Sequence, residues 1–247
     1  MRLPTYLLII YTLISCTCIH AQDIEMKDHQ TRVELILQAP DMSFQFDSVG
    51  YSKFKDFKFY TKNGETGIFF FDSAKIHLID FNLDGLKDVI VEERRLHNAT
   101  FIFANDSKGF REVWVGPGTP VFIKKDQETT VYMYSDQVGC IDIRLLFEVR
   151  IDTNNRVEEH LFSYHQQTQV QDLNRKFITK AVTGILRTTP VIDNSDTSDS
   201  CTGEIRKGNQ IKTIENQSVV VIKEIDDWQM VIYTKLNNSI IAWINNS

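Results

Sequence analysis

Acidic and amide side chains alternate along the stretch from Asp80 to Asp88, and this pattern is typical of a calcium loop. Side-chain oxygens recur at positions 1, 3, 5 and 9 of the stretch, and Gly85 stands at position 6. The glycine permits a sharp turn, for which we expect a positive φ at Gly85, so that oxygens before and after it can converge on one cation. The backbone carbonyl at position 7 is a usual additional ligand. We therefore predict a structural calcium site with ligands from Asp80, Asn82, Asp84, Leu86 and Asp88.

Both flanks of this loop indicate β-strands rather than helices. The runs Ile76–Ile79 and Val89–Val91 lack helical spacing, and Val91 stands where an EF-hand carries its bidentate glutamate. The loop is therefore expected to join two strands. An Asx-rich hairpin turn without a metal is the alternative, although so many spaced oxygens around a glycine exceed what a turn requires.

The loop resembles the Asp-x-Asn-x-Asp-Gly-x-x-Asp loops of FG-GAP (VCBS-type) β-repeats. It is also similar to a loop in small periplasmic β-domain immunity proteins that neutralise peptidoglycan hydrolases. The segment Phe101–Phe110 is similar to the usual sequel in those families, which is a strand, a polar turn with glycine and then an aromatic residue. The resemblance implies a calcium-stabilised β-domain and, through the second family, protection against a cell-wall hydrolase.

Short apolar runs rich in β-branched and aromatic residues continue at regular intervals on both sides of the loop. Turn residues separate them, which predicts an all-β domain, an antiparallel sandwich or a propeller-like array of sheets. Only one copy of the loop occurs, so a propeller of identical repeats is not supported. The expected strands are Val33–Leu37, Met42–Phe46, Phe54–Tyr60, Ile68–Phe71, Ile76–Ile79, Val89–Val91, Thr100–Phe103, Glu112–Val115, Pro120–Ile123, Thr130–Tyr134, Ile141–Ile151 and Val157–Phe162.

The sequence turns polar and weakly helical after residue 167, which predicts a linker or one short helix at residues 169–177. This linker divides a calcium-loop β-domain at residues 22–168 from a second domain at residues 178–247. The second domain resembles a bacterial SH3-like (SH3b) module through Gly184–Pro190, Gly203–Ile211, Asp227–Val231 and Ile241–Ile244. The resemblance implies a small barrel that binds cell wall or protein.

Trp228 and Trp243 are the candidate ligand-binding aromatic residues of this second domain. Core packing is the alternative role for both, because so small a barrel has a thin core and depends on large side chains for its burial.

Residues 1–21 predict a secretory signal peptide, with Arg2, an apolar run and small residues. Cleavage before Gln22 is one interpretation, and a lipobox ending in a lipid-modified Cys16 is the other. No later segment is long and apolar enough for a membrane span. The mature chain is thus expected in the periplasm or at the cell surface. There, Cys140 and Cys201 either form a disulfide or remain two separate thiols.

Composition and spacing argue against nucleic-acid binding and against catalysis. The net charge is −6, and the basic residues form no stripe of the kind that phosphate binding needs. Cys140 opens a strand-like run rather than a helix, which is a poor context for a nucleophile. His160 and His165 would point to opposite faces of a strand, which is poor geometry for sharing a metal. The Ser-rich run of residues 195–200 lacks a nucleophile elbow.

The sequence therefore predicts an exported, non-catalytic binding protein of the bacterial envelope, whose partner is a protein or peptidoglycan. The sharper interpretation is an inhibitor or immunity protein against a peptidoglycan hydrolase. The alternative is a wall hydrolase or hydrolase accessory that docks on peptidoglycan through its SH3-like module.

Overall fold

The computed structural model describes residues 29–39, 48–50, 58–62, 74–93, 99–136, 143–174, 177–198 and 205–246. Several features expected from the sequence lie outside these ranges. They are the signal peptide with Cys16, both body cysteines Cys140 and Cys201, and the expected strands Met42–Phe46 and Ile68–Phe71.

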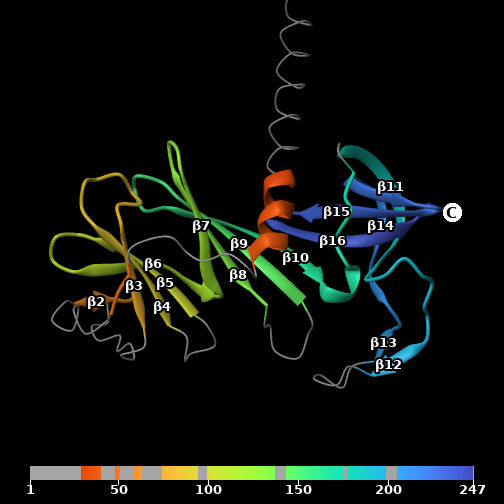
Figure 1. The fold of residues 1–247 in the computed structure, drawn as a ribbon, viewed down its shortest axis with the longest axis horizontal. Coiled ribbons are helices and arrows are strands. Elements are labelled where there is room, and N and C mark those ends of the chain that lie inside the picture. Colours follow the sequence, from red (N-terminus) through yellow and green to blue (C-terminus); the bar gives the residue numbers. More distant parts are fainter. Residues whose placement is uncertain are drawn as a thin grey trace, which may run out of the picture.

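The first sheet has six strands in the order β1-β3-β4-β5-β6-β2 (Figure 1). β3 to β6 form an antiparallel meander, while β2 pairs in parallel with β6. The loop of residues 80–88 joins β3 to β4 as a hairpin connection, as the sequence predicted. The strands are β1 (Ser48–Gly50), β2 (Phe59–Tyr60), β3 (Lys75–Ile79), β4 (Asp88–Glu93), β5 (Ala99–Asn105) and β6 (Phe110–Pro117).

The second sheet has eight strands in the order β11-β14-β15-β16-β10-β9-β8-β7. A separate two-stranded ribbon, β12 with β13, extends from it. With these sheets the all-β prediction is confirmed. The strands are β7 (Thr119–Lys125), β8 (Thr129–Ser135), β9 (Ile143–Ile151), β10 (Val157–His165), β11 (Ile178–Arg187), β12 (Asp196–Ser198), β13 (Ile205–Lys207), β14 (Gln210–Ile225), β15 (Trp228–Lys235) and β16 (Asn238–Asn245).

One expected strand, Val33–Leu37, is wrong, because it lies within a helix of residues 29–38. The segment is dense in apolar residues, including the β-branched Val33 and Ile36, and this density suggested a strand. Its buried positions instead recur every three or four residues, as they do on one face of a helix. These buried positions are His29, Arg32, Val33, Leu35, Ile36 and Ala39.

The two sheets and the helix form three layers. One face of the first sheet packs on β8 and β9 through a core that includes Ile90, Ile102, Met133 and Phe147. The helix covers the opposite face of the second sheet, where Ile36 shares a core with residues of β8, β10, β15 and β16. Strand β8 is buried along its whole length, because it is covered on both faces.

The C-terminal strands curl into a small barrel. β11 pairs with β14 along its length and with β16 at Arg187 and Trp243, so that β11, β14, β15 and β16 close around a separate apolar core. The 3-10 helix η3 (Gln166–Thr168) ends immediately before the predicted linker of residues 169–177, and the described part of this linker contains no strand. The strands on its two sides nevertheless share one sheet, because β10 and β16 pair in parallel.

Candidate functional site

The predicted calcium loop folds into a compact turn whose oxygens accept hydrogen bonds from the loop itself. Gly85 has a φ of +88°, which is the positive value that the sequence predicted. Asn82 Oδ1 accepts from the backbone N–H of Asp84 at 3.2 Å, and Asp84 Oδ1 accepts from that of Leu86 at 2.7 Å. Asp80 Oδ2 accepts from Gly85 N–H at 3.1 Å. The spacing of these residues therefore stabilises the turn directly.

Asp88 differs from the other predicted calcium ligands, because it is fully buried at the start of β4. Its Oδ2 accepts from the N–H of Phe81 at 2.9 Å and its Oδ1 from the N–H of Asn105 at 2.8 Å. Burial raises the pKa of Asp88 to about 6, even though these hydrogen bonds act to lower it. Asp88 thus ties the loop to the turn after β5.

The fit of this loop to calcium has one supporting feature and one opposing feature. Asp80 Oδ1 is buried and has no hydrogen-bond partner, so a cation would satisfy it. Among the described residues, however, no three His, Cys, Asp or Glu side chains gather as a metal-binding group. The remaining side-chain oxygens of the predicted ligands already accept N–H groups, as they would in a metal-free Asx turn. Calcium binding by Asp80, Asn82, Asp84, Leu86 and Asp88 therefore stays a prediction.

Four turns meet at this end of the sandwich. Lys125 Nζ, at the end of β7, donates to the carbonyl oxygen of Asp80 at 2.6 Å. Asn82 Nδ2 donates to Asn155 Oδ1, in the β9–β10 turn, at 3.2 Å. Together with the Asp88 contacts, these bonds hold the loops after β3, β5, β7 and β9 as one surface, which we call the loop end. Leu83 and Leu86 are 47% and 39% exposed on it.

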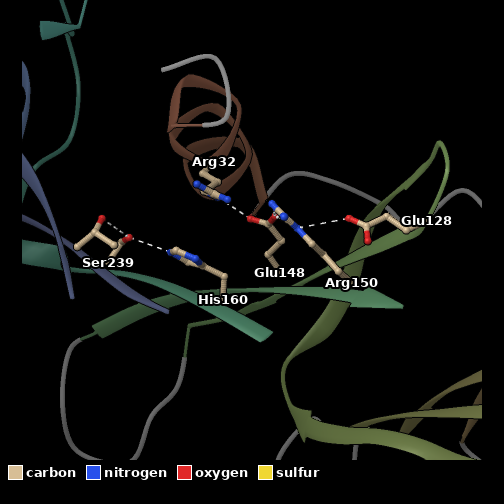
Figure 2. Close-up of polar contacts among 7 residues, drawn as sticks. Arg32, Glu128, Glu148, Arg150, His160 and Ser239 are labelled. Carbon is tan, nitrogen blue, oxygen red and sulfur yellow. Dashed lines mark hydrogen bonds and ion pairs between the residues drawn. The ribbon is translucent and has the colours of Figure 1, made fainter. Parts of the chain in front are cut away.

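A buried charge cluster lies on the face of the second sheet that the helix covers (Figure 2). Glu148 of β9 lies in register with Tyr132 of β8 and His160 of β10. Arg32 Nε of the helix donates to Glu148 Oε2 at 2.5 Å, and Arg150 Nη2 donates to Glu148 Oε1 at 2.5 Å. Burial alone would raise the pKa of Glu148, but Arg32 and Arg150 outweigh burial and lower it. Glu148 is therefore an anion at neutral pH.

His160 and Ser239 form the second part of this cluster, and Figure 2 shows the imidazole directed toward the serine. His160 Nε2 and Ser239 Oγ are hydrogen-bonded at 2.9 Å, and Thr234 Oγ1 lies 2.8 Å from the same Ser239 oxygen. Burial, reinforced by the positive charge of Arg32, lowers the pKa of His160 to about 4. Neutral His160 could accept a proton, but Ser239 is only 2% exposed, so no substrate can approach its oxygen.

A polar pocket of about 650 Å³ opens beside Arg32, Glu148 and Arg150. Charged side chains that line this pocket form ion pairs with one another. Lys124 Nζ lies 3.0 Å from Asp126 Oδ2, and Arg150 Nε lies 3.9 Å from Glu128 Oε1. An ion entering this pocket would have to displace these pairs. Glu148 is also unsuited to act as a general acid, since that role needs a raised pKa. The cluster therefore holds the helix on the sheet.

The two candidate aromatic residues have different environments. Trp243 is 3% exposed within the core beneath the helix, and its Nε1 donates to the carbonyl oxygen of Thr168 at 3.2 Å. A residue so buried offers no ring face to a ligand from solvent. Trp228 is partly buried at the start of β15 and packs against the edge of the same core. Ligand binding at Trp228 stays a prediction.

Comparison with protein-family models, curated proteins and solved structures gives no match to this chain. The resemblances to FG-GAP, immunity and SH3-like families therefore stay predictions. None of the helical segments in the described part of the chain has the length and apolarity of a membrane span.

Sequence reasoning did not identify the Arg32–Glu148–Arg150 cluster. The two arginines and the glutamate are ordinary surface residue types, and Arg32 lies in a segment that was expected to be a strand. The available signal was Glu148 between the apolar Phe147 and Val149, in a run that also carries Asp142, Arg144 and Arg150. A charge at such a position requires a partner from another element.

Proposed function

We propose that this chain is an exported, non-catalytic binding protein of the bacterial cell envelope that blocks a peptidoglycan hydrolase. The observation that carries the proposal is that the polar groups best suited to chemistry are committed to structural contacts. Glu148 is an anion between two arginines, and Ser239 is buried between His160 and Thr234. The export part of the proposal depends on the signal-peptide pattern of residues 1–21.

The loop end supports a binding role. Its turns are cross-linked by Asp88, Lys125 and Asn155, so little conformational entropy would be lost when a partner docks. Leu83 and Leu86 are exposed among the polar residues of the loop, and protein-binding patches usually combine apolar with polar side chains. Loops on a rigid β-scaffold are common binding elements. We therefore assign the hydrolase-binding surface to the loop end.

Inhibition of a lysozyme-type hydrolase tests this function. The exported chain should slow clearing of a peptidoglycan suspension by the added enzyme and should cause no clearing by itself. The double variant Leu83→Asp/Leu86→Asp should lose inhibition. Leu236→Asp is the matched control, because Leu236 is 86% exposed at the β15–β16 turn, which is not one of the four turns of the loop end. Clearing by the chain alone would show that it is an enzyme.

Docking on peptidoglycan as a hydrolase accessory is the second candidate function. Trp228 favours it, because this residue at the start of β15 is only partly buried, whereas Trp243 is 3% exposed. Sedimentation with purified sacculi, with and without Trp228→Ala, tests it. Sedimentation that depends on Trp228, combined with no inhibition of the hydrolase, would favour the accessory role over the inhibitor.

A further inference from the structure

The polar pocket of about 650 Å³ has its charges separated along the strands of the second sheet. Its buried end lies beneath the helix, where Arg32 and Arg150 stand on either side of the single carboxylate of Glu148 (Figure 2). Its exposed end lies at the end of β7 and at the turns after β7 and β9. Three carboxylates and one ammonium group line this end, and they belong to Asp126, Glu128, Asp152 and Lys124. The pocket therefore has an excess of positive charge at the buried end and of negative charge at the exposed end.

The guanidinium group of Arg32 is incompletely hydrogen-bonded. Arg32 is only 7% exposed, yet Nε alone of its guanidinium nitrogens donates a hydrogen bond, to Glu148. Neither Nη group has a hydrogen-bond partner among the described residues. Both nitrogens nevertheless keep some accessible surface, and Arg32 lines the pocket, so a group inside the pocket can reach them. Unbonded N–H groups on a largely buried cation are costly, and a ligand that accepts hydrogen bonds from them removes this cost.

The distribution of charge decides which class of ligand fits the pocket. A bare anion on Arg32 would be repelled by Glu148 and by the carboxylates of the exposed end. A bare cation would be repelled by Arg32 and Arg150, and a neutral ligand would leave both ends uncompensated. A zwitterion places one charge at each end. A carboxylate is the suitable group for the buried end, because its two oxygens match the planar fork of a guanidinium group.

The ion pairs at the exposed end do not prevent such a ligand from binding. The side chains of Lys124 and Asp126 are 54% and 63% exposed, and exposed pairs of this kind contribute little free energy. An ammonium group can therefore replace Lys124 beside Asp126 at small cost. The Nε–Glu148 hydrogen bond of Arg32 is not displaced, because the ligand uses the Nη groups.

The length of the pocket indicates the size of the ligand. Tyr132, which lies opposite Glu148, marks the buried end, and Glu128 stands four residues earlier in the chain at the exposed end. Four residues of extended chain span about 13 Å. An extended tripeptide separates its terminal charges by about 10 Å, and the long side chains at both ends cover the difference. The volume is also within the range of about 300–1,000 Å³ that is usual for small-ligand sites.

We propose that this pocket binds a short zwitterionic peptide. The C-terminal carboxylate of the peptide accepts hydrogen bonds from the Nη groups of Arg32, and its N-terminal ammonium group lies among the carboxylates of the exposed end. The site goes beyond the proposed function and does not depend on it, because Leu83 and Leu86, to which hydrolase binding was assigned, do not line the pocket.

Calorimetric titration of the full exported chain with tri-alanine tests the proposal. Tri-alanine amide lacks the carboxylate, N-acetyl-tri-alanine lacks the ammonium group, and inorganic phosphate is an anion without a cationic end. Tri-alanine should bind, both blocked peptides should bind at least ten-fold more weakly, and phosphate should not bind. Absence of tri-alanine binding, or equal affinity for tri-alanine and its amide, overturns the proposal. Binding of phosphate without binding of tri-alanine would identify a simple anion site and also overturns it.

Two variants locate the binding in this pocket. Arg32→Lys keeps a positive charge beside Glu148 but removes the Nη groups, so it should weaken tri-alanine binding about ten-fold while circular dichroism shows a folded chain. Asp126→Asn/Glu128→Gln changes only exposed residues and therefore leaves the fold intact, and it should weaken binding several-fold. If Arg32→Lys does not fold, this second variant decides.

The double variant Asp226→Asn/Asp227→Asn is the matched control. It removes the same amount of charge from the exposed β14–β15 turn, which does not line the pocket, so the affinity should stay unchanged. Equal affinities of Asp126→Asn/Glu128→Gln and this control overturn the proposal. None of these outcomes affects the hydrolase-inhibition assay, which depends on Leu83 and Leu86, so failure of this site is distinguishable from failure of the proposed function.

Discussion

Arg32 Nε lies 2.5 Å from Glu148 Oε2, although the two residues are 116 positions apart in the chain. The side chains of both are less than one-tenth exposed. This ion pair is a polar link between the helix and the sheet beneath it, beside an apolar core that the two share.

Arg32→Ala should destabilise the fold by about 3–5 kcal/mol, because it leaves the buried carboxylate of Glu148 with only Arg150 as a partner. The free energy of unfolding in urea measures this loss. Arg156→Ala is the control, because Arg156 is an exposed residue of the β9–β10 turn. A loss for Arg32→Ala no larger than that for Arg156→Ala would mean that the ion pair contributes nothing to the docking of the helix.

The contribution of Glu148 to the free energy of unfolding should decrease at low pH. Its pKa in the folded state lies below the ordinary value of 4.5, so its stabilisation is complete above about pH 4.5 and decreases as the pH falls through the lowered value. The difference in unfolding free energy between wild type and Glu148→Gln should therefore be constant from pH 5 to 7 and shrink below about pH 4.5. A difference that grows with acidification would mean that the folded-state pKa is raised.

Calcium should raise the melting temperature of the wild type, and a chelator should reverse this effect, if the loop of residues 80–88 binds the ion. Asp84→Ala should abolish the response, because it removes a ligand while Asp88 continues to tie the loop to Asn105. Thermal melts in calcium and in chelator measure this. Equal melting temperatures of the wild type in both buffers would identify the loop as a metal-free Asx turn.

Gly116→Ala should destabilise the protein by about 1–3 kcal/mol, because the new Cβ would lie 2.4 Å from the indole ring of Trp114, which must move within a packed core. Gly85→Ala is an informative comparison. Its Cβ would meet nothing within 4 Å, and the strain of a positive φ is then the only cost, about 1–2 kcal/mol. Chemical denaturation measures the loss of stability in both variants. Near-UV circular dichroism separates the two cases, because only the repacking around Trp114 should change it.

The sequence predicted the strands well because alternation and turn residues are local signals. The observed β5, β6, β8 and β10 each contain the run expected for them and extend it by one to three residues at an end. The positive φ of Gly85 was predicted for the same reason, since the turn itself requires it. Local chemistry was sufficient at these positions.

The helix of residues 29–38 and the charge cluster were not predictable in the same way. Val33–Leu37 is an apolar stretch that is compatible with a strand over so few residues. Its helical pattern of burial becomes evident only from its packing on the second sheet. The environment of Glu148 depends on Arg32, which lies far away in the chain. The burial of Trp243 likewise depends on the helix and on Thr168. Contacts between distant segments leave no short-range signal.

The parallel pairing of β10 with β16 has a consequence for the order of folding. β10 has β9 on one side and the last described strand of the chain on the other. A nascent polypeptide that ends before residue 238 therefore leaves the N–H and C=O groups along one margin of β10 unbonded. The core beneath the helix also stays incomplete, because Ile241 and Trp243 are still missing from it. Collapse to the native state must wait for the final strand, and such long-range closure makes folding slow.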